Sequence, residues 1–372
     1  MPASPELHWC SNCMAMSTRP RITFDTRGWC NACQWMESKT SLNWSEREAQ
    51  LEALLNKHRN LTGEFDCLVP VSGGKDGSYV AYNLKHKYGM NPLCVTVTPP
   101  LPLALGEQNL RSFIEAGYPH ISVNPPYEVM RNLNKTGFIE MGFPYYGWLI
   151  AIQAIPVRLA CQFGINLIFY GEDGEVEYGG STQTSKDPIY SVEYMKKVYL
   201  EGGYQKVFEA SGLTSSELNL FEFPPDACLS KGLEITHWSY FENWDPYRNY
   251  LIAKEHCGLQ ESTDTNSGTF TNYSQNDQAL YALHTYLMYL KFGFGRANQD
   301  ASIEIRRGAM DRDQAVNLVK LYDGAYPQEY IPEYLAYYQL SREEFDAVLA
   351  KWANKDLFTF SNGRWMPNFV VQ

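Results

Sequence analysis

Short apolar runs alternate with amphipathic stretches through the first half of the chain. Each run has the length of a strand buried on both faces, and each is followed by apolar residues at helical spacing. Residues 77–88, for example, place Val80, Leu84 and Tyr88 on one helix face. The expected strands are 65–71, 92–97, 120–123 and 165–171, and the expected helices are 77–88, 106–118, 127–142 and 145–163. This alternation predicts right-handed crossovers and an α/β fold with a doubly wound parallel sheet.

The pattern changes on both sides of this sheet domain. Ser45 and Glu48 form a capping-box signal ahead of leucines at helical spacing, and Asp311 and Ser341 are N-cap signals of later helices. The expected units are a zinc-ribbon lobe (1–44), a linker helix (45–62), the sheet domain (63–180), an aromatic and polar substrate-facing insertion (181–275) and a helical C-terminal region (276–372).

Composition and charge narrow the class of protein. The chain has 372 residues, 44% of them hydrophobic, which suits one large domain with additions. It has no run of about 18 apolar residues, so no membrane span is expected. The first residues, MPASPELHWC, lack the segments of a secretory signal, which favours the cytoplasm. The net charge of -11 has the wrong sign for a protein that follows a nucleic-acid backbone.

Four of the nine cysteines form two C-x2-C pairs, Cys10 with Cys13 and Cys30 with Cys33. Four thiolates in a tetrahedron are the ligands of closed structural zinc sites. An iron–sulfur cluster and a pair of disulfides are the alternatives, but the intervening residues resemble a short ribbon with no redox partner, which favours structural zinc. The remaining cysteines, Cys67, Cys94, Cys161, Cys228 and Cys257, are scattered singly in mostly apolar settings that are typical of core residues.

The stretch Ser72-Gly-Gly-Lys-Asp76 lies where the first predicted strand meets the first predicted helix. Backbone N–H groups in such a turn converge on an anion, helped by the helix N-terminus, and a lysine adds a point charge for phosphate. The spacing is neither G-x-x-x-x-G-K-[ST] nor G-x-G-x-x-G, so a Walker loop is excluded and a dinucleotide fold is disfavoured. The stretch therefore predicts a different type of phosphate-binding loop.

This loop closely resembles the pyrophosphate-binding loop of the N-type ATP pyrophosphatases, the PP-loop superfamily with its HUP-like fold. The resemblance implies that Asp76 holds the magnesium ion bridging the phosphates of ATP. The usual family loop has serine where this chain has Gly77, so one hydroxyl contact is missing; a Gly77→Ser change is expected to be tolerated if glycine is merely a variant. The residues that the resemblance assigns to ATP and pyrophosphate are Ser72, Gly73, Gly74, Lys75, Asp76, Gly77 and Ser78.

A second stretch, INLIFYGEDGEVEYGGST, follows the fourth predicted strand and is rich in carboxylates. Because ligands bind beyond the carboxyl ends of such strands, Glu172, Asp173, Glu175 and Glu177 are candidates for a magnesium or substrate role. A solvated acidic loop is the alternative. Lys75, Asp76, Glu172, Asp173 and Glu175 are the predicted catalytic residues, with Asp173 as a second magnesium ligand and Glu172 or Glu175 orienting ammonia or the sugar.

Four features together resemble the N-acetyl sugar amidotransferases of surface-polysaccharide (lipopolysaccharide, O-antigen) and nonulosonic acid biosynthesis. They are the phosphate loop, the acidic stretch, the paired cysteines and the segment KFGFGRANQDASIEIRRG (291–308). The resemblance extends over nearly the whole chain. It implies that ATP and ammonia convert an acetamido group on a sugar, nucleotide-linked or nonulosonic, into an acetamidino group. An imidoyl-adenylate forms with release of pyrophosphate, and ammonia then displaces AMP.

Three further residues are candidate substrate contacts. Arg296 in FGFGRA suits a phosphate or a sugar carboxylate, or else is an ordinary ion-pair arginine. Tyr145 and Tyr146 are able to stack on a sugar or base, although aromatic residues in such positions are more often part of a core.

The main alternative function is a tRNA sulfurtransferase, because zinc ribbons and the same ATP loop occur together in that class as well. Sulfur transfer normally needs a reactive cysteine pair or a cluster in the ATP domain, where this chain has only isolated cysteines. A non-catalytic nucleotide sensor is a third class, which measurable pyrophosphate release would exclude.

The chain also lacks an obvious glutaminase nucleophile. A glutaminase needs a cysteine at the mature N-terminus or on a glycine-flanked elbow, and none of the unpaired cysteines has a glycine two places before it. Since free ammonia is scarce at neutral pH, we expect a separate glutaminase subunit to supply it, as the family resemblance also implies.

Overall fold

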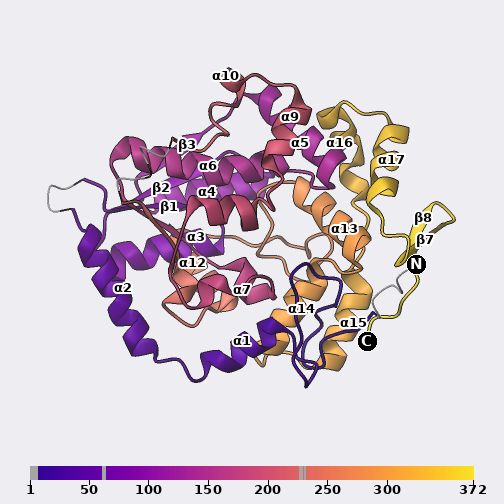
Figure 1. Cartoon of the computed structure of the whole chain (residues 1–372), viewed down its shortest axis with the longest axis horizontal. Helices are drawn as coiled ribbons and strands as arrows, with labels where there is room; N and C mark the ends of the chain where they lie inside the picture. Colours follow the sequence, from indigo (N-terminus) through magenta and orange to yellow (C-terminus); the bar gives the residue numbers. More distant parts are fainter. Residues whose placement is uncertain (1–6, 61–63, 226–228, 230–231) are drawn as a thin grey trace.

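A computed structural model describes residues 7–60, 64–225, 229 and 232–372, with a six-stranded sheet at its centre (Figure 1). The strand order is β3-β2-β1-β4-β6-β5, and all neighbours are parallel except β5, which is antiparallel to β6. The strands are β1 (Cys67–Pro70), β2 (Pro92–Val97), β3 (His120–Val123), β4 (Leu167–Tyr170), β5 (Ile189–Tyr190) and β6 (Glu234–His237). The predicted α/β class with a parallel sheet is confirmed.

Helices cover both faces of the sheet, which explains the continuous apolar runs of the strands. In β1, Cys67 and Val69 pack on the side of Val80, whereas Leu68 packs on the opposite side against Val157. The helices around the sheet are α2 (Trp44–His58), α3 (Lys75–Tyr82), the π-helical turn η1 (Asn83–Lys87), α4 (Ala104–Glu115), α5 (Tyr127–Met141), α6 (Tyr146–Phe163) and α12 (Pro246–Cys257).

The start of the linker helix differs from the prediction. The N-cap of α2 is Asn43, whose side chain accepts a hydrogen bond from the Glu46 amide at 3.2 Å. The predicted capping box of Ser45 and Glu48 is therefore wrong, because Asn43, another good cap, begins the helix earlier.

Residues 181–275, the expected insertion, contribute β5 and β6 to the sheet, so the sheet extends beyond residue 180. Thr236 and His237 of β6 are buried polar residues. The short helices and turns between β4 and α12 are α7 (Gly174–Tyr178), η2 (Gln183–Ser185), α8 (Val192–Tyr194), η3 (Met195–Tyr199), α9 (Tyr204–Ser211), α10 (Ser215–Leu218) and η4 (Trp238–Tyr240).

The C-terminal region is mainly helical and shares a large apolar core with α5 and α6. The predicted N-caps Asp311 and Ser341 are confirmed, each in a complete capping box. The elements are α13 (Leu280–Phe292), α14 (Arg296–Arg306), α15 (Arg312–Tyr322), η5 (Gln328–Tyr330), α16 (Ile331–Tyr338), α17 (Arg342–Trp352), β7 (Phe358–Ser361) and β8 (Arg364–Pro367), the last two forming a hairpin.

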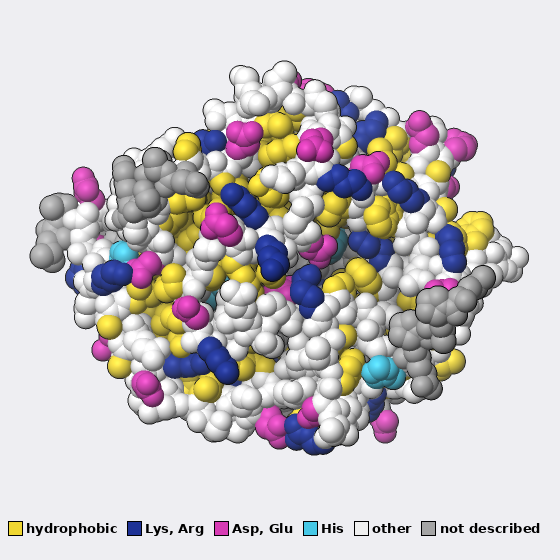
Figure 2. Space-filling view, in the orientation of Figure 1, with side chains coloured by type: hydrophobic (Ala, Val, Ile, Leu, Met, Phe, Trp, Pro, Cys, Tyr) yellow, Lys and Arg dark blue, Asp and Glu magenta, His cyan; other side chains and the backbone are white. Residues whose placement is uncertain are grey.

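Two surface features bear on possible partners. Within the described ranges, no helix combines the length and hydropathy needed to cross a lipid bilayer. On the face shown in Figure 2, Lys and Arg side chains are interspersed with Asp and Glu side chains rather than gathered in one basic patch.

Candidate functional site

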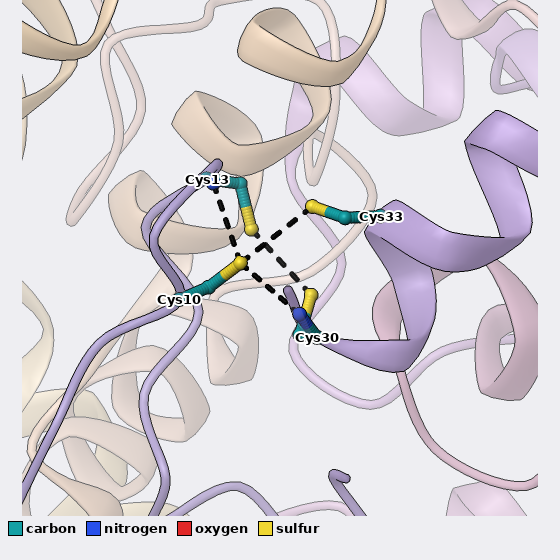
Figure 3. Close-up of side chains that lie close together, drawn as sticks. All are labelled: Cys10, Cys13, Cys30 and Cys33. Atoms are coloured by element: carbon teal, nitrogen blue, oxygen red, sulfur yellow. Dashed lines mark hydrogen bonds between the residues drawn. The ribbon is translucent and has the colours of Figure 1, made fainter. Parts of the chain in front are cut away.

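The four paired cysteines converge on one point (Figure 3). The Cys10 and Cys33 sulfurs lie 3.7 Å apart, as do those of Cys13 and Cys30, and all four lie within 4.8 Å of one another. A tetrahedron with Zn–S bonds of about 2.3 Å has S···S edges of about 3.8 Å, so the arrangement fits zinc. All four residues are buried, and they form no disulfide. The predicted cysteine cluster is confirmed as a possible structural metal site.

The N-terminal lobe (residues 7–44), which holds the four cysteines, packs against the C-terminal helices (Figure 1). Cys30 is the N-cap of α1 (Asn31–Lys39), which carries Cys33 in its first turn. Arg312 of α15 donates to the carbonyl oxygens of Cys10, at 2.8 Å, and Cys13. Arg306 of α14 lies with one nitrogen 3.6 Å from the Cys13 sulfur. The lobe is thus attached to residues that lie between 293 and 302 positions away in the sequence.

The acidic stretch after β4 is a short helix rather than a solvated loop. Asp173 is the N-cap of α7, and its carboxylate accepts hydrogen bonds from the Glu175 amide at 3.1 Å, the Thr184 hydroxyl and the Tyr199 hydroxyl at 3.3 Å. The structure does not place Asp173 in the cavity beside Asp76. Its carboxylate is occupied by capping, which argues against its predicted role as a magnesium ligand.

The next two carboxylates, in α7, join the sheet domain to the N-terminal lobe. Arg21 binds Glu175 with two nitrogens at 2.7 and 2.9 Å, and Lys39 binds Glu177 at 2.6 Å. The Trp35 indole also donates to Glu177 at 3.0 Å. Glu175 therefore holds two parts of the protein together and does not line the cavity, contrary to the catalytic role predicted for it.

The predicted phosphate loop lies at the carboxyl end of β1. Gly74 is the N-cap of α3 and has no side chain to cap the N–H groups of the first helical turn, whose residues Lys75, Asp76 and Gly77 line the cavity. Gly73 has φ of +81°, and a Cβ there would lie 2.6 Å from the Leu110 Cα in α4. Ser72, Gly74, Lys75, Asp76 and Gly77 line the cavity, whereas Gly73 and Ser78 do not.

Gly77 and Ser78 serve packing in this structure. A Cβ at Gly77 would lie 2.8 Å from the Pro70 carbonyl oxygen and 3.0 Å from the Val71 Cα. Glycine lets α3 approach β1 closely, so the expectation that Gly77→Ser is tolerated is not supported. Ser78 is fully buried on the same helix.

Asp76 and Glu172 form an anionic pair beside the loop. Lys75 lies 2.5 Å from one Asp76 oxygen, while the other, Oδ1, is buried and has no hydrogen-bond partner. Burial, together with the negative charge of Asp76, raises the pKa of Glu172 to about 7. A cation would satisfy the unpartnered oxygen and relieve the repulsion, so this pair, rather than Asp76 with Asp173, fits magnesium.

The loop opens into a polar cavity of about 350 Å³. Tyr145 and Arg296 line this cavity, but Tyr146 does not: its hydroxyl bonds to the Leu200 carbonyl oxygen inside the core. The Arg296 guanidinium forms an ion pair with Asp300 at 2.8 Å. Asp323 accepts hydrogen bonds from the Gly295 and Asn298 amides and so fixes the start of α14, where Arg296 lies.

A second, mainly apolar cavity of about 640 Å³ adjoins the first at the ends of β1 and β2. Val97, Pro99, Leu110, Trp148 and Ile152 are among its lining residues. The residues that line both cavities are Ser72, Gly77, Gly106, Asp277 and Tyr281. The two cavities therefore meet beside the phosphate loop.

The sequence did not reveal the part of the site that lies just before α13 and in the first two turns of that helix. Asp277, Tyr281 and His284 line the polar cavity. Burial, with smaller effects from the charges of Lys291 and Arg296, lowers the pKa of His284 to about 3, so its imidazole is neutral. The sequence predicts an apolar helix from Asp277 to Phe292, whereas α13 begins at Leu280, and only the fold places the residues before it over the loop.

The scattered cysteines lie apart from these cavities. Cys67 and Cys94 are fully buried in the sheet, Cys257 is buried in α12, and Cys161 lies on α6. Among the residues that the structure describes, no cysteine lines either cavity. Cys228 lies outside the described residues.

Comparison with known proteins gives two findings. An uncharacterized protein of Methanocaldococcus jannaschii is 33% identical over 89 residues, which cover 24% of this chain and 32% of the relative's length. A family model described as "LPS biosynthesis protein WbpG-like, C-terminal domain" matches residues 267–369. That range includes Asp277, His284 and Arg296 of the polar cavity. The match supports a surface-polysaccharide biosynthesis family and is consistent with a sugar-modifying biosynthetic role.

Proposed function

We propose that the protein is an ATP-dependent amidotransferase that converts an acetamido group on a sugar into an acetamidino group. The observation that carries the proposal is the meeting of two unlike cavities at one phosphate loop. The apolar cavity suits a nucleoside, and the polar one suits a sugar with its amide. The match of the C-terminal domain to LPS biosynthesis proteins favours a sugar substrate over tRNA.

In this proposal, ATP lies across the junction of the cavities. The adenosine occupies the apolar cavity, and the β- and γ-phosphates rest on the loop from Ser72 to Gly77, near the Lys75 ammonium. Asp76 and Glu172 would hold the magnesium ion, whose charge would neutralise the departing pyrophosphate. The α-phosphate then faces the polar cavity, where the sugar binds.

The chemistry follows from the weakness of an amide as an electrophile. Its oxygen attacks the α-phosphate, pyrophosphate leaves, and the oxygen becomes part of a good leaving group. Ammonia adds to the amide carbon, and AMP departs with the original amide oxygen. The protein supplies positioning and charge neutralisation for both steps, to which Lys75 and Arg296 contribute positive charge.

The source of ammonia is part of the proposal. Since none of the described cysteines lines either cavity, we expect a separate glutaminase subunit to deliver ammonia. The single chain should then use a high concentration of ammonium chloride but not glutamine. Glutamine hydrolysis by the purified chain at the rate of product formation would contradict the two-subunit arrangement.

The decisive experiment follows the amide oxygen. The chain is incubated with ATP, Mg²⁺, ammonium chloride and a panel of free and nucleotide-linked acetamido sugars whose acetamido oxygen carries a heavy isotope. Mass spectrometry should find the label in AMP and a sugar in which NH replaces oxygen. Label that stays in the sugar, or AMP formation that needs no sugar, would refute the proposal. ATP-dependent thiolation of tRNA would favour the sulfurtransferase instead.

Loop variants complete this test. Lys75→Ala and Asp76→Asn should each abolish AMP formation without unfolding the protein, because they act on the phosphates and their metal ion. Lys87→Ala is a matched control, since Lys87 is an exposed lysine paired with Glu48 outside the cavities. Wild-type rates in the Asp76→Asn variant would exclude the proposed mechanism.

A further inference from the structure

Asp277 lies where the two cavities meet. It is one of the five residues that line both, and the only one of them with an acidic side chain. If adenosine fills the apolar cavity and pyrophosphate rests on the loop, the α-phosphate lies at this junction. Asp277 is then close to the atoms that react, and it comes from the domain that matches LPS biosynthesis proteins.

Backbone hydrogen bonds hold Asp277 and its neighbours in place at the junction of the cavities. The Leu103 amide donates to the Asp277 carbonyl oxygen at 3.1 Å, and the Ala279 amide donates to the Leu101 carbonyl oxygen at 2.9 Å. At Gly106, a Cβ would lie 2.7 Å from the Asn276 carbonyl oxygen, so the two segments touch. The Tyr281 hydroxyl donates a hydrogen bond to Asp277 Oδ2 at 3.2 Å.

We propose that Asp277 is the general base that removes the amide proton of the acetamido group as its oxygen attacks the α-phosphate. The inference rests on the proposed function. The N–H electron pair forms the C=N bond, the C=O π electrons form the new O–P bond, and the P–O bond to pyrophosphate breaks. When ammonia adds to the carbon, Asp277 returns its proton to the same nitrogen. AMP leaves with the oxygen, and one proton of the former ammonia goes to solvent.

The surroundings of Asp277 suit this task. Burial raises its pKa to about 6, and the hydrogen bond from Tyr281 acts in the opposite direction. A base with a pKa near the working pH transfers protons efficiently. The titratable groups that face it or line the same cavities are Tyr145, Tyr281, His284, Lys75, Asp76, Glu172, Tyr178, Tyr273, Arg296, Glu107, Glu115, Arg111 and Tyr170.

The test compares Asp277→Asn with Asp264→Asn, an exposed aspartate of the preceding segment that lines neither cavity. With an acetamido sugar on which the wild type forms AMP, Asp277→Asn should lower kcat by about 10²- to 10⁴-fold. Its Kd for Mg-ATP, measured by calorimetry without sugar, should stay within a few-fold of the wild type. The Asp264→Asn variant should match the wild type in both.

A second variant keeps the inference testable if Asp277→Asn does not fold. Tyr281→Phe removes a hydrogen bond that favours the charged carboxylate, so the acid limb of the kcat–pH profile should move to higher pH. Wild-type kcat in Asp277→Asn, or an unmoved acid limb in Tyr281→Phe, would overturn the assignment. A wild-type protein that forms no AMP with any acetamido sugar would instead overturn the proposed function, so the two failures are distinguishable.

Discussion

Replacing Gly73 by alanine tests whether the phosphate loop is held against α4 by contact between backbones. Gly73 has φ of +81°, and a Cβ there would lie 2.6 Å from the Leu110 Cα and 2.7 Å from the Asn109 carbonyl carbon. Neither atom belongs to a side chain that rotates away. The loop or the helix must therefore move to admit one methyl group.

Gly89 provides the matched control. It also has a positive φ, +61°, but a Cβ at Gly89 has nothing within 4 Å. The left-handed conformation costs alanine about 1–2 kcal/mol at either position, and the entropic gain of Gly→Ala in the unfolded chain is common to both. Overpacking adds about 1–3 kcal/mol at Gly73 alone. The expected loss of unfolding free energy is thus about 1–2 kcal/mol for Gly89→Ala and about 2–5 kcal/mol for Gly73→Ala.

Urea denaturation followed by fluorescence measures both values by linear extrapolation. Sugar-dependent AMP formation should fall in Gly73→Ala, because the loop shifts under the phosphates, and should be kept in Gly89→Ala. Equal stabilities of the two variants would refute the reasoning, since the backbone contact at Leu110 would then impose no measurable cost.

Three further predictions concern the metal site, the lobe contact and the start of α14. Elemental analysis should find about one zinc per chain in the wild type and in Cys257→Ser. Cys13→Ser should lose most of this zinc and should unfold at a lower urea concentration. A full zinc content in Cys13→Ser would contradict the assignment. Lys39→Ala should lower the unfolding free energy by about 3–5 kcal/mol, because it leaves the largely buried Glu177 carboxylate without its cation. A double-mutant cycle with Glu177→Gln should show that the two effects are coupled, and additive effects would contradict an energetically important ion pair. Burial raises the pKa of Asp323 to about 7, so the folded protein keeps a proton that the unfolded chain loses near pH 4. Raising the pH from about 4 to about 7 should therefore lower the unfolding free energy of the wild type relative to Asp323→Asn by up to about 1.4 kcal/mol per pH unit. A difference that does not change with pH would exclude this titration.

The sheet is the part of the molecule that the sequence predicts best. The strands β1, β2 and β4 are apolar runs that need burial on both faces, and their length, with helical spacing after each run, identifies them together with α3 to α6. Strand β3 (HISV) is only partly buried and was predicted from its place in the alternation. Strand β6 escapes this reasoning, because Glu234–His237 holds polar residues that become buried through tertiary contacts. Its sequence carries little of the apolar signal on which the prediction depends.

The candidate site was predictable only where a local motif specifies its geometry. The loop from Ser72 to Gly77 is a local turn, and its spacing is visible in the sequence. The roles of Glu175 and Glu177 depend on Arg21 and Lys39, which lie more than 130 residues away in the sequence. Because these partners cannot be seen locally, the cluster of acidic residues by itself suggested a metal or substrate site. Asp277 had no local signal of a functional role, because the sequence predicts it only as the first residue of a helix and the fold alone places it beside the cavities.

The attachment of the N-terminal lobe has a consequence for the order of events during synthesis. Arg312 binds the carbonyl oxygen of Cys10 across 302 positions, so the part of the docking surface that α14 and α15 provide appears only when most of the chain has emerged. Contacts of such long range form late, because a large loop must close before they stabilise anything. Until then the lobe has only its contacts with α7 to hold the four cysteines in place, together with any metal ion that they bind. A ribosome-bound chain that ends before α14 should therefore expose the lobe to chelators and oxidants that the finished protein resists.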